Sequence, residues 1–312
     1  MIGSDASGSN PSQQPGIFRT ILVPLDGSPQ SSVALLPART LAGLVGARVF
    51  LVRVVPSPEF GAGSSINENE ALTWLRRTRD ELGASGLHVE VQLRHGDIAE
   101  QVGKAAQELG ANLVVMASHG RHGLARAILG SVSTQVVTHG MTPVVLLRPG
   151  GKRMTQVQTL LVPVDGSPGG SLALGFATGL ARGAGARLIL LDVAPQIPDY
   201  AYASPGGLYI DPSWDEDALA AARTYVDALS ARLDRHGFQV ESRTALGDAA
   251  ASILQAARDV DADLIVMSTH ARTGLARAVL GSVADAVARG ADRPIMVIPH
   301  HAAQAIGEPP PA

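Results

Sequence analysis

Short runs of continuous apolar residues alternate with longer amphipathic stretches along the chain. A strand that helices cover on both faces reads as an unbroken apolar run, whereas a half-exposed strand alternates between apolar and polar positions. The first part of the chain therefore predicts a mostly parallel sheet whose weakest, alternating strand lies near an edge. The predicted strands are residues 21–25, 49–55, 89–93, 113–116 and 144–147.

The second part of the chain repeats this order of apolar runs. Its predicted strands are residues 160–164, 188–193, 240–245, 264–267 and 295–298. Helix-like stretches separate the strands, so each part reads β-α-β-α-β-α-β-α-β. The predicted fold class is α/β, with two tandem doubly wound domains, each having a five-stranded parallel sheet and helices on both faces.

Two long segments occur twice in the same order, which indicates two copies of one domain. Residues 21–29 return as 160–168, and residues 123–132 return as 274–283. The predicted division of the chain is a disordered tail at 1–16, a first domain at 17–149, a linker at 150–157, a second domain at 158–300 and a disordered tail at 301–312.

The second copy carries about twelve extra residues after its second strand. This segment is rich in Pro, Gly and Tyr, which is typical of a loop. We place this insertion at 194–214. It is expected to be either a lid or partner-binding segment, or an irregular excursion without a role.

Four serines are predicted to cap helices. Ser28 and Ser167 each precede a proline, which is the usual order of a capping hydroxyl and a first helical residue. Ser131 and Ser282 are expected to cap the later helix of each copy.

Composition narrows the classes of function. The 312 residues are 46% hydrophobic and only 4% aromatic, so Val, Leu, Ile and Ala must form the core. A net charge of -3 without a long basic run argues against a nucleic-acid partner. Since there is no cysteine, disulfides, thiolate nucleophiles and cysteine-bound metals are excluded.

The expected location is the cytoplasm, with no membrane partner. The first sixteen residues lack the basic and apolar regions of an export signal. No apolar run reaches the roughly 18 residues that a membrane span needs.

The strongest chemical signals follow the first and fourth strands of each copy. In an open parallel sheet, ligands bind beyond the carboxyl ends of the strands, where the strand order reverses. Asp26 can accept hydrogen bonds from a sugar or hold Mg²⁺, while Gly120, Gly130 and Ser131 open a helix whose amides favour phosphate. The alternative is that Asp26 only stabilises its Asp-Gly turn and that the glycines only end helices.

These segments resemble the universal stress protein family, over nearly everything from residue 17 to residue 299. The resemblance rests on the Pro-x-Asp of Pro24 and Asp26 and on a family loop, Gly-x2-Gly-x9-Gly-Ser/Thr, which here begins at Ala117. It implies the strand order 3-2-1-4-5 and an ATP site in which Asp26 touches ribose, Val54 meets adenine and the later loop holds phosphates. AMP or ADP is the other nucleotide expected, and Mg²⁺ the accompanying ion.

Carried over residue by residue, the resemblance marks two sites. In the first copy they are Pro24, Asp26, Val54, Met116, Ala117, His119, Gly120, Gly130, Ser131, Val132 and Ser133. In the second copy they are Pro163, Asp165, Val193, Met267, Ser268, His270, Gly281, Ser282 and Val283.

The second copy departs further from the family loop. Ala117 replaces the first loop glycine in the first copy, whereas the second copy has Ser268 and Ala271 at both glycine positions and Ala284 in place of Ser133. A side chain where positive φ or close phosphate approach is needed costs about 1 kcal/mol or more. The first copy is therefore the better candidate for nucleotide binding.

The remaining polar residues of the loops have weaker signals. His119, His122 and His270 lack the spacing of metal ligands, so no metal site is predicted. Arg126 and Arg277 are equivalent and are either ligands of a terminal phosphate or exposed surface charges.

The predicted function is an adenine-nucleotide-binding stress-response regulator that acts as a nucleotide sensor through a protein partner, not an enzyme. The phosphate loop of fast NTPases is missing, although slow ATP hydrolysis or autophosphorylation near Ser131 or His119 is an alternative. A second alternative is an interaction protein with degenerate sites. A third, an adenylate-forming ligase, lacks the loops that such ligases use.

Assembly is predicted from the last strand of each copy. Residues 144–147 and 295–298 are apolar and stand at a sheet edge, which invites pairing. The family resemblance implies antiparallel pairing of these strands. The chain is thus expected to form an intrachain pseudo-dimer, and two chains a homodimer.

Overall fold

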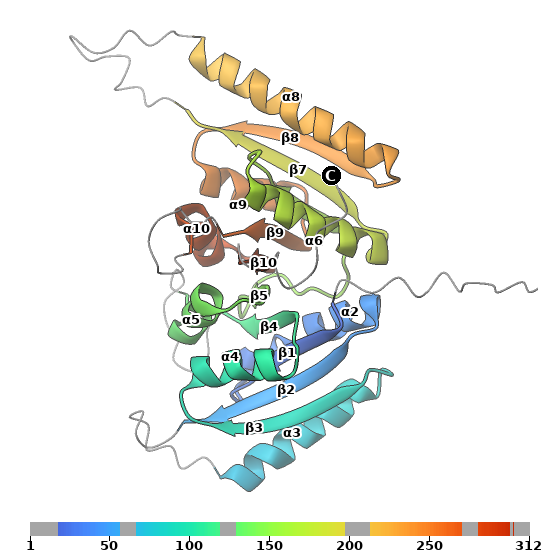
Figure 1. Ribbon diagram of the computed structural model, residues 1–312, viewed down its shortest axis with the longest axis vertical. Helices are drawn as coiled ribbons and strands as arrows, with labels where there is room; N and C mark the ends of the chain where they lie inside the picture. The colour runs from blue at the N-terminus through green and yellow to red at the C-terminus, as the bar shows by residue number, and fades with distance from the viewer. Residues whose placement is uncertain are drawn as a thin grey trace, which may run out of the picture.

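The computed structural model describes residues 18–56, 67–118, 129–196, 213–269, 280–299 and 302. One ten-stranded sheet runs through the molecule (Figure 1). The strands of the first copy are β1 (Thr20–Pro24), β2 (Arg48–Val55), β3 (Val89–His95), β4 (Leu113–Ala117) and β5 (Val144–Leu147). Those of the second copy are β6 (Thr159–Pro163), β7 (Arg187–Ala194), β8 (Val240–Leu246), β9 (Leu264–Ser268) and β10 (Ile295–Ile298).

The strand order confirms the predicted fold class. The sheet runs β3-β2-β1-β4-β5-β10-β9-β6-β7-β8, so each copy has the order 3-2-1-4-5. All pairs within a copy are parallel, and the weaker strands β3 and β8 lie at the two outer edges. The predicted strands match the observed ones to within one or two residues.

Helices cover both faces of the sheet. Packed on one face are α1 (Pro29–Ser32), α2 (Leu35–Val45), α3 (Glu68–Gly83), α6 (Pro168–Ala184) and α8 (Trp214–Arg235). Packed on the other are α4 (Ile98–Glu108), α5 (Ser131–His139), α9 (Ala249–Asp259) and α10 (Ser282–Gly290). Of the insertion predicted at 194–214, Ala194 ends β7 and Trp214 begins α8, while residues 197–212 lie outside the described residues.

The first helix of the first copy is broken in two, unlike its counterpart in the second copy. Pro37 has no N–H to donate to the carbonyl of Val33, and its ring crowds that carbonyl. The chain accordingly leaves α1 at Val33 and starts again as α2 at Leu35. Phe176 stands at the equivalent position of the second copy, and α6 is continuous.

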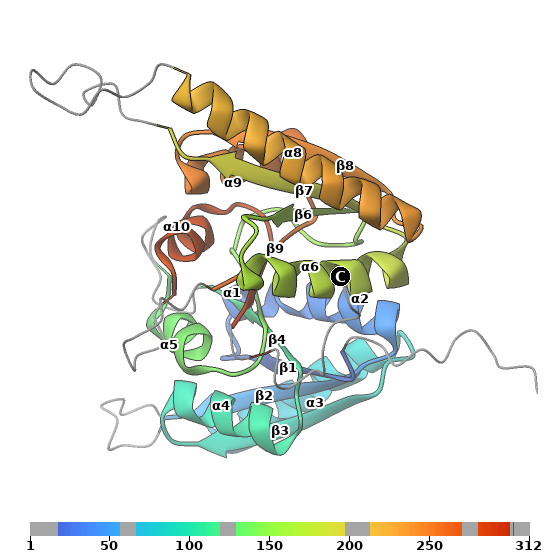
Figure 2. The same ribbon diagram turned by 45° about the horizontal axis from the view of Figure 1, so that its top comes forward.

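The two copies join edge to edge, which confirms the predicted intrachain pseudo-dimer. Strands β5 and β10 pair antiparallel, with Leu146 opposite Ile295 and Val144 opposite Val297. Both hydrophobic layers contain residues of both copies. Helices α2 and α6 meet across the junction (Figure 2), and the rings of Phe18 and Phe176 stack with centroids 5.9 Å apart.

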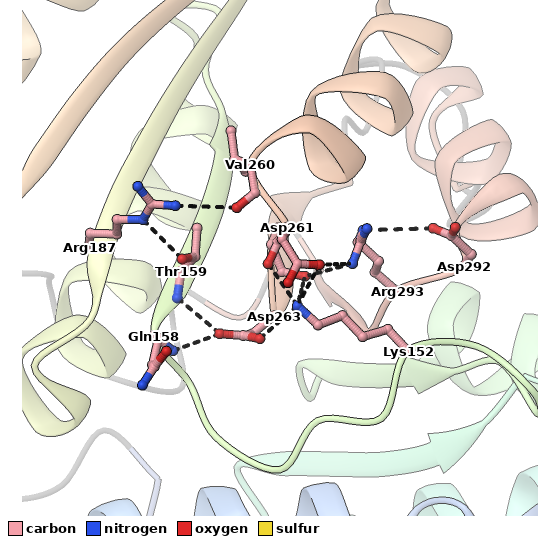
Figure 3. Close-up of polar contacts among 10 residues, drawn as sticks. Lys152, Gln158, Thr159, Arg187, Val260, Asp261, Asp263, Asp292 and Arg293 are labelled. Carbon is pink, nitrogen blue, oxygen red and sulfur yellow. Dashed lines mark hydrogen bonds and ion pairs between the residues drawn. The ribbon is translucent and has the colours of Figure 1, made fainter.

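A buried aspartate holds the linker to the second copy (Figure 3). Asp263, only 7% exposed, accepts hydrogen bonds at Oδ2 from the amides of Gln158 (2.8 Å) and Thr159 (3.1 Å). Its Oδ1 pairs with the Lys152 ammonium at 2.9 Å, and Lys152 also donates to the carbonyl of Asp261 at 2.7 Å. This cluster fixes where the linker enters β6.

The first copy has an amide at the place of this aspartate. Asn112 Oδ1 accepts hydrogen bonds from the amides of Arg19 (2.9 Å) and Thr20 (3.1 Å) in the same geometry. Both copies thus share the two backbone contacts, whereas the negative charge is found only in the second copy, where it pairs with Lys152 of the linker.

Within the part of the chain that the structure describes, no helix is long and apolar enough to cross a membrane.

Candidate functional site

Each copy has a topological switch point between its first and fourth strands. From β1 the chain continues to β2 and β3 on one side, whereas β4, paired with β1 on the other, leads to β5. Pro24 and Ala117 end these two strands, and Pro163 and Ser268 end β6 and β9 in the second copy. The predicted site segments therefore meet at the same edge of the sheet in each copy.

The aspartates after β1 and β6 hold turns. Asp26 Oδ1 accepts a hydrogen bond from the Ser28 amide at 2.8 Å, and Asp165 Oδ1 accepts one from the Ser167 amide at 3.0 Å. Gly27 supplies the positive φ of 80° that the turn needs. The structural role considered from the sequence is therefore present. A carboxylate offers about four acceptor positions, so this one hydrogen bond does not by itself exclude a ligand contact.

The serines before the prolines cap their helices as predicted. Ser28 Oγ accepts a hydrogen bond from the Ser31 amide at 3.1 Å, and Ser167 Oγ accepts one from the Gly170 amide at 3.2 Å. These bonds fix where α1 and α6 begin, directly after the aspartate turns.

The prediction that Ser131 and Ser282 cap helices is wrong. Glycines occupy the N-caps of α5 and α10, and the serines are the first helical residues. The amide of Gly130 donates a hydrogen bond to the carbonyl of Ser118 at 2.8 Å, and this contact holds Gly130 in place. No described side chain caps either helix, so the first-turn amides of α5 and α10 lack such a partner within the described residues.

Ser133 ties α5 to the end of β4. It is 3% exposed, and its hydroxyl donates to the carbonyls of Ser118 (3.0 Å) and Ala117 (3.2 Å). Ala284 stands at this position in α10 and has no hydroxyl for such a contact. Ser131, by contrast, is exposed at the edge of the sheet.

The apolar residues of the predicted site lie in or beside the core. Met116, Met267 and Val54 are buried, and Val193 is partly buried. Val132 packs against the same hydrophobic layer, while Val283 is 36% exposed. Their side chains lie along the edge of the sheet where the predicted site segments meet.

Several residues considered in the sequence analysis lie outside the described residues: the predicted ligands His119, Gly120 and His270, and also His122, Arg126, Ala271 and Arg277. Their roles stay predictions. Among the residues that are described, no group of three or more His, Cys, Asp or Glu could hold a metal ion.

The sequence analysis missed a residue of the first copy that lies against the aspartate turn. Arg53 on β2 is 7% exposed, and a Cβ added to Gly27 would lie 2.9 Å from its Nη1. The guanidinium also lies over the ring of Trp74 on α3, 5.7 Å from its centroid. A position-by-position comparison of the copies would have found it, because Asp192 replaces Arg53 and Tyr225 replaces Trp74 in the second copy.

The replacement changes the electrostatics of the second copy. Burial, and then the charge of Asp165, raise the pKa of Asp192 above its usual value. Burial also raises the pKa of Tyr225, whose hydroxyl hydrogen-bonds with the Gly166 backbone. Two carboxylates thus face the second switch point where the first copy has one carboxylate and a guanidinium.

Comparisons with known proteins agree with this architecture. The Universal stress protein family matches residues 17–148 and 156–299. A universal stress protein of Mycolicibacterium smegmatis is 27% identical over 293 residues, covering 89% of this chain and 96% of the relative. One from Mycobacterium tuberculosis is 28% identical over 304 residues, covering 93% and 98%.

A solved structure supports the fold over both copies. The universal stress protein from Archaeoglobus fulgidus superposes with a TM-score of 0.71 at 19% identity, covering 90% of this chain and 98% of that one. Since the family matches both copies, the chain belongs to the universal stress protein family and carries two of its domains in tandem.

Proposed function

We propose that the protein binds an adenine nucleotide in its first copy and acts as a nucleotide-sensing stress-response regulator through a protein partner. The observation that carries the proposal is the start of α5, where Gly130 is the N-cap and no described side chain caps the first turn. Amides at such a helix start, with the positive end of the helix dipole, favour phosphate.

The described residues suit different parts of a nucleotide. Asp26 offers carboxylate oxygens to the ribose hydroxyls, and the backbone at Val54 offers hydrogen bonds to adenine. Ser131 is exposed and opens α5, so we assign its hydroxyl to phosphate. Ser133 already donates to the end of β4, and we assign it the positioning of α5. The expected contacts of His119 and Gly120 rest on the family resemblance.

Magnesium fits this site only together with a nucleotide. Mg²⁺ prefers oxygen ligands and usually takes several of them from phosphates. Asp26 supplies one hard oxygen donor at the switch point, and no described cluster supplies three. We therefore propose that Mg²⁺ arrives with ATP and that AMP binds without it.

The same reasoning ranks the second copy lower. Asp165 is exposed whereas Asp26 is partly buried, Ala284 lacks the hydroxyl of Ser133, and the larger Ser268 stands where the first copy has Ala117. These differences favour the second candidate function, an interaction module with a degenerate site, for this copy alone.

Binding is proposed without rapid catalysis. The sequence suggests no pairing of a general base with a nucleophile, and it lacks the phosphate loop of fast NTPases. Slow hydrolysis or autophosphorylation then depends on the loop beyond Ala117. The cytoplasmic location, the homodimer and the domain limits at 17–149 and 158–300 are proposed on the grounds given by the sequence.

The experiment uses the full-length protein. Freshly purified protein is denatured, and the supernatant is assayed for adenine nucleotides, followed by calorimetric titration of nucleotide-free protein with ATP and Mg²⁺. We expect about one high-affinity site per chain, with a micromolar dissociation constant, which corresponds to a binding free energy of about -8 kcal/mol. No copurifying nucleotide and no heat of binding at millimolar ATP would refute the proposal.

Matched variants locate the site. Asp26→Ala should abolish high-affinity ATP binding, whereas Asp165→Ala, the equivalent change in the second copy, should leave it within about twofold. Both variants lose one turn hydrogen bond, so their melting temperatures report the structural role separately. Equal effects of the two variants on affinity would contradict the assignment to the first copy.

A further inference from the structure

The two switch points carry opposite charges at one equivalent position, Arg53 on β2 and Asp192 on β7. The partner side chain changes as well, from Trp74 on α3 to Tyr225 on α8. This exchange reverses the sign of the charge that one strand carries beside the aspartate turn.

In the first copy the guanidinium lies directly against the aspartate turn. A Cβ on Gly27 would lie 2.9, 3.1 and 3.2 Å from Nη1, Cζ and Nη2 of Arg53. Trp74 supports the guanidinium from below, with its centroid 5.7 Å from Cζ. A buried cation thus lies beside the turn that contains Asp26, under Gly27, whose φ of 80° favours glycine there.

In the second copy the space beside the turn is filled differently. A Cβ on Gly166 would lie 3.9 Å from Cζ of Tyr225, so a neutral ring stands near the turn. Burial, and then the nearby charge of Asp165, raise the pKa of Asp192, so the two carboxyl groups lie close to each other. An arriving phosphate would meet two carboxylates there.

The helix at the second switch point adds a further negative group. Asp285 lies in the first turn of α10, where the first copy has Thr134. Its carboxylate pairs with Arg289 at 2.8 Å, which offsets much of its charge but leaves the helix start less attractive to a second anion.

We propose that Arg53 and Asp192 are specificity determinants that direct the anionic nucleotide to the first copy: Arg53 attracts its phosphates, and Asp192 repels them from the second copy. This inference rests on the proposed nucleotide site. The two residues act through charge at the turn, so their effect should follow the charge of the ligand and weaken as salt screens it.

The test compares ATP with adenosine, which shares the base and ribose but has no charge. Arg53→Gln keeps the length and polarity of the side chain and removes the charge. We expect it to weaken Mg²⁺–ATP binding about tenfold, equivalent to about 1.4 kcal/mol, and to change adenosine binding less than twofold. Arg53→Lys keeps the charge and should retain ATP affinity within about threefold.

The matched variant in the second copy is Asp192→Asn. It should raise the number of ATP molecules bound from about one to about two per chain, and adding Asp165→Ala should remove the second one. Equal losses of ATP and adenosine binding in Arg53→Gln would mean that Arg53 only supports the turn, which overturns the inference.

The outcomes separate this inference from the proposed function. If the wild type binds ATP but Arg53→Gln keeps its full affinity and Asp192→Asn stays at one site, the inference fails and the function stands. If the wild type binds neither ATP nor adenosine, both fail. Melting temperatures of all variants, measured without ligand, identify any that have lost the fold.

Discussion

Replacing Asp263 with asparagine tests how the linker is held to the second copy. The change converts this position to what Asn112 is in the first copy, so the two backbone contacts at Gln158 and Thr159 can persist. What disappears is the charge that faces Lys152 at 2.9 Å.

The expected cost follows from burial. Hydrogen bonds to charged groups contribute about 1.5–3 kcal/mol, and exposed ion pairs less than about 1 kcal/mol. The Lys152 side chain is 23% exposed and that of Asp263 10%, so the pair lies between these cases. Lys152 also keeps its contact with the Asp261 carbonyl. We expect Asp263→Asn to lower the free energy of unfolding by about 1.5 kcal/mol.

Removing the acceptor entirely should cost more. Asp263→Ala also leaves two amides at the start of β6 without their acceptor, for a total of about 3–4 kcal/mol. Asn112→Ala is the control in the first copy, where the two neutral backbone contacts alone should cost about 1–2 kcal/mol.

Urea unfolding followed by circular dichroism measures these differences, and amide exchange at Gln158 and Thr159 reports the local effect. A double-mutant cycle with Lys152→Met isolates the ion pair and should give a coupling of about 1 kcal/mol. If Asp263→Asn unfolds at the wild-type urea concentration, or if the two changes add without coupling, the linker is not held by this charge.

Three further outcomes follow from the structure. Ser133→Ala should destabilise the protein by about 1 kcal/mol in urea unfolding, because it removes the buried hydroxyl contact between α5 and β4; a stability unchanged from wild type would count against that contact. Asp192→Asn should stabilise the protein at pH 7 by less than about 1 kcal/mol. The pKa of Asp192 is raised in the folded protein, so the ionised carboxylate destabilises the fold once the pH rises through that pKa. The gain in melting temperature should therefore vanish below the ordinary pKa of 3.8, and a gain that persists there would contradict this cause. Phe18→Ala should cost about 4 kcal/mol, and much less in a Phe176→Ala background, because the two rings stack across the junction; full additivity would argue against that contact.

Much of the fold was predictable from local patterns. The apolar runs and the alternating stretches predict every strand to within one or two residues, because the pattern of apolar residues along the chain follows which side chains are buried. The Ser-Pro pairs at Ser28 and Ser167 were correctly identified as helix starts, since a cap depends on neighbours three residues away. The repeat then predicted the second copy from the first.

Local patterns were less reliable where two signals compete. Glycine and serine both favour helix starts, and the sequence analysis chose Ser131, whereas Gly130 is the cap. The amide of Gly130 donates to the end of β4, and this contact is not visible in the sequence. The break between α1 and α2 had a visible cause in Pro37, yet its place depends on which carbonyl the proline faces.

The sequence by itself determined the α/β class, the two copies, their strand pattern and the segments that meet at each switch point, because these depend on periodicity and repetition. Only the tertiary structure decided that Arg53 and Trp74 lie beneath the turn of Asp26, and that Lys152 from the linker reaches Asp263. Such contacts join residues far apart in the chain, and their geometry depends on how sheet, helix and linker pack together, which no local pattern encodes.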